Sequence, residues 1–192
     1  MSTQQVFDTI YLSNEWGYLS GDGSDSKNAG PWLKCVENFL SKKDVTTVLD
    51  IGCGDWRLGA LYNLKGKKYT GLDVSEIAIN YVKGNTTQDI TFIHGDALSY
   101  NWDSVDLILI KDVLQHLPND TITAIVDKVM AGCKYALICN DIGVHCNTDI
   151  GVGKYRTLNL TKDPFNYPFT FTDVYTSGNY LKAINLYERV KS

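Results

Sequence analysis

The stretch VLDIGCGDW, at residues 48–56, constrains the fold more than any other part of the chain. It begins as a short apolar run with one acid and continues as a tight turn that contains Gly52 and Gly54. Glycine tolerates a left-handed backbone and lets a ligand approach without a Cβ in the way. We predict a buried strand at 46–51 and a helix at 55–64 whose first N–H groups face a ligand. Such a unit opens a nucleotide-binding α/β domain, although an ordinary strand-to-helix turn has the same pattern.

The spacing of these glycines restricts the ligand. A dinucleotide-binding motif would have a third glycine where Arg57 stands, and a phosphate-binding Walker loop would end in Gly-Lys-Ser or Gly-Lys-Thr, which is absent. What remains is D-x-G-x-G, with Asp50 at the end of the strand. A carboxylate there suits a positively charged ligand and would repel a pyrophosphate.

Two further acids follow later strands. The expected strand 67–72 ends in Asp73, about twenty residues beyond the glycine turn, where an acid accepts hydrogen bonds from ribose hydroxyls. Asp73 would also serve as the N-cap of the next helix, and the two roles are compatible. Asp96 and Ala97 follow the expected strand 90–94. The position of Asp73 favours a nucleoside as part of the ligand.

Strand and helix patterns alternate along the chain from residue 46. The expected strands are 46–51, 67–72, 90–94, 105–110, 134–139 and 180–189, and the expected helices are 4–12, one that begins at Pro31, 55–64, 75–83 and 119–131. Alternation of this kind predicts an α/β fold with a mostly parallel sheet, helices on both faces and an antiparallel C-terminal strand. We expect a single domain over 1–192, with N-terminal helices and a ligand-covering loop (1–45), a nucleotide-binding core (46–141) and an acceptor loop with the final strand (142–192).

Composition excludes several classes of protein. The net charge of −4 offers no broad basic surface for a nucleic-acid backbone, so no nucleic-acid partner is favoured. Five cysteines without a C-x-x-C pair suggest neither a disulfide framework nor a structural zinc site. The polar start MSTQQ is unlike a signal peptide, and no apolar run reaches the length of a membrane span. We therefore expect a cytoplasmic protein, and its oligomeric state is left open.

Catalytic candidates follow the expected strand 105–110. Its continuous apolar run indicates burial on both faces, and Lys111, Asp112 and His116 come next. If Asp112 opens a helical turn, His116 shares its face, so the carboxylate would orient the imidazole as a general base. The alternative is that Asp112 caps a short helix and His116 packs under the edge of the sheet.

The chain resembles the class I S-adenosylmethionine-dependent methyltransferases, and within them a subgroup of glycan (sugar) O-methyltransferases. D-x-G-x-G resembles motif I of that family, and the wider resemblance rests on NEWGYLSGDGS (14–24), DIGCGDW (50–56), DLILIKDVLQHL (106–117) and YRTLNLTKDPFNYPF (155–169). It implies a Rossmann-like fold and S-adenosyl-L-methionine as the methyl donor. The cofactor-binding residues that it implies, together with those argued above, are Trp16, Ser24, Asp50, Gly52, Cys53, Gly54, Asp73, Val74, Asp96, Ala97 and Lys111.

A magnesium site is a second hypothesis for the strand ends. Asp112, Asn140 and Asp141 carry hard oxygen ligands, which would hold Mg²⁺ as in catechol-type methyltransferases. The order Asn-Asp is the reverse of the catechol-type order, so no metal is favoured.

The acceptor is expected to be a small polar molecule, and a saccharide above all. Candidate acceptor-binding residues are Asp141, His145, Tyr155, Arg156 and Asn166. Aromatic faces and amides suit a sugar ring, and an arginine suits the diphosphate of a nucleotide sugar or a nearby acid. Phe165 and Tyr167 would instead serve equally well as core residues that hold the loop to the sheet.

These observations together predict methyl transfer to a hydroxyl of a sugar, in a glycan or a nucleotide sugar. His116 is the first choice for the general base and Asp112 the second. An RNA or protein methyltransferase, and a catalytically inactive methyltransferase-like binding subunit, are the alternatives.

Overall fold

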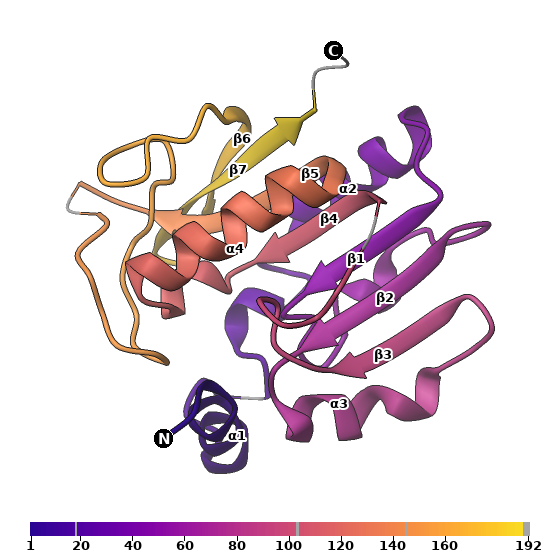
Figure 1. Cartoon of the computed structure of the whole chain (residues 1–192), viewed down its shortest axis with the longest axis horizontal. Coiled ribbons are helices and arrows are strands. Elements are labelled where there is room, and N and C mark those ends of the chain that lie inside the picture. The colour runs from indigo at the N-terminus through magenta and orange to yellow at the C-terminus, as the bar shows by residue number, and fades with distance from the viewer. Residues whose placement is uncertain (18, 103, 145, 190–192) are drawn as a thin grey trace.

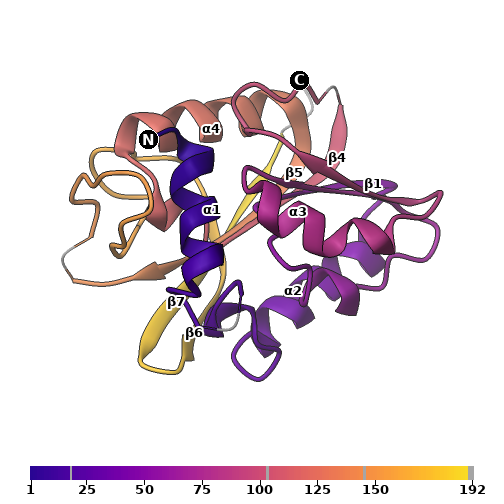
Figure 2. The same cartoon turned by 90° about the horizontal axis from the view of Figure 1, so that it is seen from below.

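The computed structural model describes residues 1–17, 19–102, 104–144 and 146–189, and this part of the chain forms a seven-stranded sheet with helices on both faces (Figures 1 and 2). The helices are α1 (Thr3–Ser13), α2 (Gly30–Lys42), α3 (Glu76–Val82) and α4 (Asn119–Gly132). The strands are β1 (Thr47–Ile51), β2 (Lys68–Asp73), β3 (Ile90–His94), β4 (Val105–Lys111), β5 (Cys133–Ile142), β6 (Thr170–Ser177) and β7 (Tyr180–Glu188).

The strand order is β3-β2-β1-β4-β5-β7-β6. The strands β1 to β5 pair in parallel, while β7 is antiparallel to both of its neighbours, β5 and β6. The predicted α/β fold, with a mostly parallel sheet and an antiparallel end, is confirmed. Because the order reverses direction between β1 and β4, the carboxyl ends of these two strands flank the crevice where open α/β sheets bind ligands.

The two faces of the sheet have separate apolar cores, and β4 contributes to both. Leu107 and Leu109 pack into the cluster that contains α2, whereas Ile108 and Ile110 pack into the cluster that contains α4. Successive side chains of a strand point to opposite faces, which explains the continuous apolar run of this strand. Figure 2 shows α2 and α4 on opposite sides of the sheet.

One predicted helix is wrong. In place of a helix at 55–64, the chain after Gly54 forms irregular turns and one 3₁₀ turn at Gly59–Leu61. Trp56 has a φ of 59°, which no right-handed helix accommodates, and its ring packs edge-on against Phe92 with centroids 5.1 Å apart. No helix N-terminus therefore faces a ligand at this turn.

The sequence also failed to predict β6, which lies within the segment expected to be irregular. It is the edge strand of the sheet, and most of its side chains are exposed. Its segment TFTDVYTS is rich in residues that favour strands, but the apolar residues do not alternate regularly with polar ones, so the alternation pattern did not single it out. In the described part of the chain, no helix is both long enough and apolar enough to cross a bilayer.

Candidate active site

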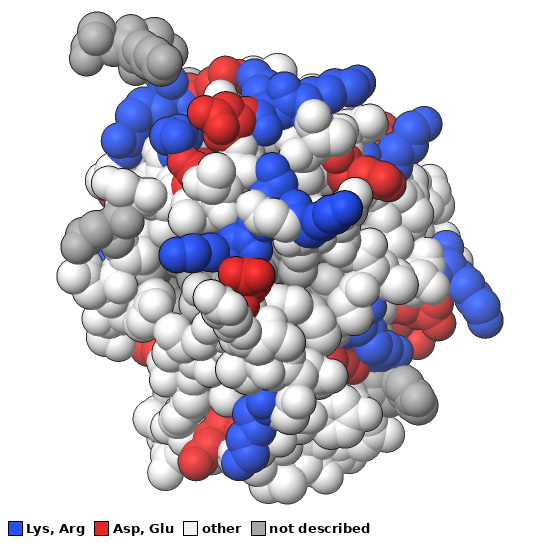
Figure 3. All heavy atoms as spheres, turned by 90° about the vertical axis from the view of Figure 1, so that its right-hand side faces the viewer, with Lys and Arg blue, Asp and Glu red and all other residues white. Residues whose placement is uncertain are grey.

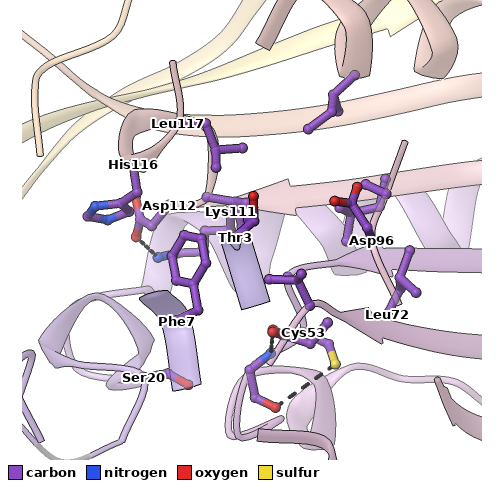
Figure 4. Close-up of a pocket in the computed structure, with 18 of the residues that line it drawn as sticks. Thr3, Phe7, Ser20, Cys53, Leu72, Asp96, Lys111, Asp112, His116 and Leu117 are labelled. Carbon is purple, nitrogen blue, oxygen red and sulfur yellow. Dashed lines mark hydrogen bonds and ion pairs between the residues drawn. The ribbon is translucent and has the colours of Figure 1, made fainter. Parts of the chain in front are cut away.

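A cavity of about 190 Å³ lies at the carboxyl ends of the parallel strands, next to α1 (Figure 4). Leu72 and Asp96 lie at one end of it, and Asp112 and His116 lie at the other. The predicted cofactor-binding residues on its wall are Trp16, Ser24, Gly52, Cys53, Gly54, Asp73, Val74, Asp96, Ala97 and Lys111. All of the predicted cofactor-binding residues except Asp50 therefore line one cavity. That they bind the cofactor stays a prediction.

The glycine turn needs glycine for two reasons. Gly52 and Gly54 have φ values of 73° and 55°, a region that favours glycine. A Cβ at Gly52 would lie 2.3 Å from the Val113 side chain, and a Cβ at Gly54 would lie 2.4 Å from the Ser20 hydroxyl. Glycine is therefore fixed here by backbone conformation and by neighbouring protein atoms, in addition to any ligand.

Asp73 occupies the buried floor of the cavity. Its carboxylate accepts hydrogen bonds from the backbone N–H groups of Gly54, at 2.9 Å, and Ser75, at 2.8 Å. Burial raises the pKa of Asp73 to about 6. The N-cap of α3 is Ser75, whose hydroxyl accepts a hydrogen bond from the N–H of Ala78, so the capping role foreseen for Asp73 is wrong.

Asp50, in contrast, does not line the cavity. Alternation along β1 turns its side chain away from Ile51, which does line it, and the Tyr69 hydroxyl donates a 2.7 Å hydrogen bond to the Asp50 carboxylate. Burial raises the pKa of Asp50 to about 7. The prediction that this acid faces the ligand is wrong, because Asp50 belongs to the α2 face of the sheet.

The segment after α1 folds back over the glycine turn. The Ser20 hydroxyl lies 3.0 Å from the Tyr11 hydroxyl and accepts a 2.9 Å hydrogen bond from the N–H of Asp55. The Trp16 ring makes edge contacts with Phe7 and Tyr11, at centroid distances of 6.0 and 6.1 Å. Phe7 and Tyr11 were missed from sequence, although their spacing of four residues places them on one helix face.

His116 lies on the cavity wall at the end where β4 ends. Its ring stacks at a tilt beside Trp16, with centroids 4.9 Å apart, and its Nδ1 lies 3.0 Å from the carbonyl oxygen of Lys154. Burial lowers the pKa of His116 below its usual value. The imidazole is therefore oriented by a backbone carbonyl and favours its neutral form.

Asp112 does not orient His116 as predicted. It has a φ of 58°, and its two carboxylate oxygens form ion pairs with Lys111 and, at 2.8 Å, with Lys182. Burial opposes ionisation of Asp112, but the two ammonium groups outweigh it and lower its pKa. Non-glycine residues held at such φ values cluster at functional sites.

Lys182 occupies the place suggested for magnesium. Its Nζ lies 2.8 Å from the Asp112 carboxylate and 2.5 Å from the Asp141 carboxylate. The third predicted ligand, Asn140, follows Cys139 on β5 and points to the other face of the sheet from Asp141. Among the described residues no group of three or more His, Cys, Asp or Glu side chains could hold a metal ion. Asn140 therefore does not converge with the other two predicted ligands, and the ammonium groups of Lys111 and Lys182 balance the two acids.

Arg156 is not placed to bind a phosphate. It is 7% exposed, and its guanidinium donates hydrogen bonds to the carbonyls of Leu114 (3.3 Å) and Leu117 (3.0 Å) and to the side chain of Asn119 (2.8 Å). These bonds hold the 3₁₀ turn Leu114–His116 in place. The diphosphate role predicted for Arg156 is therefore wrong.

The other acceptor candidates are spread over different places. Asn166 lines a separate surface hollow with Lys162 and Asp163, and not the cavity. Tyr167 packs against the core, and its hydroxyl donates a 2.8 Å hydrogen bond to Asp127, as the core interpretation requires. His145 lies outside the described residues.

Tyr155 and Asp141 lie together beyond His116. The Tyr155 hydroxyl donates a 3.1 Å hydrogen bond to the Asp141 carboxylate, and the Tyr155 ring centroid is 5.9 Å from that of His116. Asp141 is 3% exposed and also accepts hydrogen bonds from Gln115 and Lys182. Asp141 thus fixes its neighbours and does not present its carboxylate to solvent.

Comparisons with known proteins agree with this fold. Residues 48–135 match the family model described as a methyltransferase domain, whereas no curated protein sequence matches the chain. The N-methyltransferase NodS from Bradyrhizobium japonicum WM9, in complex with S-adenosyl-L-homocysteine, is 16% identical, with a TM-score of 0.73 and 100% coverage of both chains.

Two further solved structures are similar over nearly the whole chain. Magnesium protoporphyrin IX methyltransferase from Synechocystis PCC 6803, with bound S-adenosylhomocysteine, is 14% identical, covers 97% of this chain and 98% of that one, and has a TM-score of 0.69. The 1,6-didemethyltoxoflavin-N1-methyltransferase of Burkholderia thailandensis is 16% identical, covers 96% and 88%, and has a TM-score of 0.71. Residues 48–135 thus match a methyltransferase domain, and the whole chain has the Rossmann-like fold of these methyltransferases.

Proposed function

We propose that this methyltransferase transfers a methyl group to a hydroxyl of a small polar acceptor, and that this acceptor is a sugar. The observation that carries the proposal is the position of His116. It lies on the wall of the donor cavity, next to Trp16, and burial lowers its pKa, so the imidazole is neutral near pH 7. A neutral imidazole is the base that a hydroxyl acceptor needs, because a hydroxyl must lose its proton during the reaction.

The cavity suits S-adenosylmethionine. Asp73 would accept hydrogen bonds from the ribose hydroxyls, and Asp96, at the same end as Leu72, would meet the adenine amino group. Ile51 and Leu72 offer apolar walls for the nucleoside, while Trp16 and the loop at 20–24 would cover the methionine part. When bound, this cofactor supplies an activated methyl group on a sulfonium, which is a good leaving group.

The hydrogen bond of His116 to the Lys154 carbonyl assigns its tautomer. A carbonyl only accepts, so Nδ1 carries the proton and Nε2 is free to accept one. His116 would take the acceptor's hydroxyl proton at Nε2 while the hydroxyl oxygen gains the methyl group that the bound cofactor would supply. General base catalysis of this kind contributes about 10²–10⁴-fold. Alignment in the cavity supplies the rest.

Surface charge does not favour the RNA alternative. The net charge is −4, and on the face shown in Figure 3 the basic and acidic side chains are interspersed above a largely uncharged area. An RNA-binding enzyme is expected to carry a basic patch or stripe. Surface charge does not distinguish a hydroxyl acceptor from a nitrogen acceptor, and the same fold occurs in enzymes that methylate nitrogen.

The test is turnover with defined acceptors. The enzyme is incubated with S-adenosylmethionine and a panel of methyl glycosides, their deoxy analogues and the matching amino sugars, and mass spectrometry measures the gain of a methyl group. Methylation of a glycoside, lost in one deoxy analogue, supports the proposal and identifies the hydroxyl. Methylation of the amines alone would overturn it.

The role of His116 is tested by substitution. His116→Gln removes the base and keeps a polar side chain, so kcat/KM is expected to fall by about 10²-fold or more. Affinity for S-adenosylhomocysteine, measured by calorimetry, should stay within about twofold. The exposed His94, outside the cavity, provides the matched control His94→Gln, which should retain wild-type rates. An unchanged rate in His116→Gln would remove His116 from the mechanism.

The pH profile provides an independent check of the same residue. Only neutral His116 accepts a proton, so kcat/KM should rise with pH through the pKa of His116 and then level off. Because burial lowers that pKa, the midpoint of the acidic limb is expected below the usual value of about 6.5. In His116→Gln this limb should disappear.

A further inference from the structure

A row of four rings leads from the donor cavity to the surface of the β6–β7 hairpin. Trp16, His116, Tyr155 and Tyr180 follow one another at centroid distances of 4.9, 5.9 and 5.9 Å. The first two rings line the cavity, whereas Tyr155 and Tyr180 are 45% and 51% exposed. Two half-exposed aromatic rings therefore lie directly outward from the proposed base.

The ring of Tyr155 is held in position by hydrogen bonding, and Tyr180 packs against it. The hydroxyl of Tyr155 is bonded to Asp141, and Asp141 is fixed in turn by the ammonium of Lys182. The antiparallel pairing of β5 with β7 places Asp141 opposite Lys182, and Tyr180 begins β7 with its ring edge-on to Tyr155, at 74°. Rings that are already ordered lose little conformational entropy when a ligand stacks on them.

The charges beneath the row are balanced. Lys182 is 4% exposed along its side chain and pairs with both Asp112 and Asp141, so the acids present no unpaired charge to a ligand. Aromatic faces without net charge suit rings that are apolar on their faces and hydroxylated at their edges. Two such faces in series, beyond the base, suit an acceptor of more than one ring.

We propose that Tyr155 and Tyr180 form a two-ring saccharide subsite, with the reacting sugar against Tyr155 and the next sugar of the chain against Tyr180. The inference rests on the proposed function, since it assigns a subsite for the acceptor of that reaction. It goes further because it predicts that the acceptor is the terminal sugar of an oligosaccharide. It also assigns the preference for longer acceptors to Tyr180, a residue of the β6–β7 hairpin outside the donor cavity.

The experiment compares a monosaccharide methyl glycoside with disaccharides that end in the same sugar. The wild-type enzyme is expected to have the higher kcat/KM on the disaccharide. In Tyr180→Ala the ratio of disaccharide to monosaccharide kcat/KM should fall by about two- to tenfold, through KM, with the monosaccharide rate unchanged. Tyr155→Ala should raise KM for both acceptors.

Matched variants separate stacking from damage to the fold. Tyr180→Phe keeps the ring and should keep the ratio. Tyr81→Ala removes a tyrosine that is 65% exposed at α3, outside the cavity and the row, and it should also keep the ratio. Calorimetry should show the same affinity for S-adenosylhomocysteine in all of these variants, since none removes a residue of the donor cavity.

The outcomes distinguish the two proposals. Methylation of saccharides with an unchanged ratio in Tyr180→Ala would overturn the two-ring subsite and leave the proposed function standing. If no saccharide is methylated, and saturation-transfer NMR with S-adenosylhomocysteine present detects no binding of the disaccharides, both proposals are overturned. Binding of the disaccharide that weakens in Tyr180→Ala supports the subsite even where turnover is too slow to measure.

Discussion

The guanidinium of Arg156 connects the acceptor loop to the turn that carries His116. Arg156→Ala would leave the carbonyls of Leu114 and Leu117 and the Asn119 side chain without this donor. Unpaired buried acceptors are costly, so we expect a loss of about 3 kcal/mol in the free energy of unfolding. At this chain length the melting temperature should fall by about 6–12 °C, measured by calorimetry.

Arg156→Lys keeps the charge and restores one hydrogen bond at most, so its melting temperature should lie between those of Arg156→Ala and the wild type. The opposite outcome would show that Arg156 binds the acceptor and does not support the turn. In that case Arg156→Ala would keep its melting temperature within about 1 °C, and KM would rise only for phosphorylated acceptors.

Prediction of single residues succeeded where local backbone geometry decides the outcome. Gly52 and Gly54 stand in a turn whose φ values favour glycine, and Asp73 ends a strand whose carboxyl end lies at the binding crevice. Asp50 was misplaced because the motif gives its position along β1 but not its face. The alternation of Leu49, Asp50 and Ile51 contained that information, since neighbours on a strand point to opposite sides.

At the scale of elements, α1 is attached to α3 by one carboxylate. Asp8 accepts hydrogen bonds from the Ser75 hydroxyl, at 2.7 Å, and from the N–H of Ile77, at 3.3 Å. Since α1 carries Phe7 and Tyr11 to the cavity, Asp8→Ala should loosen one wall and raise the Kd for S-adenosylhomocysteine by about two- to tenfold in calorimetry.

The attachment of α1 is also expected to depend on pH. Burial disfavours the charged form of Asp8, but the hydrogen bonds from Ser75, Ile77 and Gln4 outweigh it and lower the pKa. Ionised Asp8 therefore stabilises the folded state at pH values above the pKa of about 3.9 that it has in the unfolded chain. This stabilisation is lost as the pH falls through the lower pKa that Asp8 has in the folded state. The effect of Asp8→Ala on Kd should therefore vanish in acid, whereas the exposed control Glu15→Ala should have no effect at any pH.

Two elements could not be predicted, each for a physical reason. The segment after Gly54 has helix-compatible composition, but Trp56 adopts a left-handed conformation there, with its ring packed on Phe92 and Tyr69, and a helix cannot continue through such a residue. β6 pairs with β7 at the edge of the sheet, and its Thr, Phe, Val and Tyr residues favour a strand, but without regular alternation they did not stand out from the irregular segment around them. Long periodic elements such as α4 depend less on context and were predicted within a few residues.

At the scale of the whole molecule, the sheet topology creates the charge cluster beside the active site. Lys182 is 41 residues from Asp141 and 70 from Asp112 along the chain. It meets Asp141 because β7 inserts next to β5 in antiparallel register, with Asp141 opposite Lys182. No local sequence motif predicts the contact of Lys182 with these two acids. The sequence therefore suggested a metal ion where the structure has an ammonium group.

This arrangement predicts catalysis without magnesium. The ammonium groups of Lys111 and Lys182 already balance Asp112 and Asp141, so dialysis against EDTA should leave kcat within about twofold of its starting value. Lys182→Ala would leave the buried Asp141 carboxylate without its ammonium partner, while Asp112 keeps Lys111, and should cost about 3–5 kcal/mol in the free energy of unfolding. Added Mg²⁺ should restore part of that loss in the variant, because a cation can then enter between the two acids, and should leave the wild-type melting temperature unchanged. A wild-type enzyme that loses activity in EDTA and regains it with Mg²⁺ would show that the ammonium does not replace the metal.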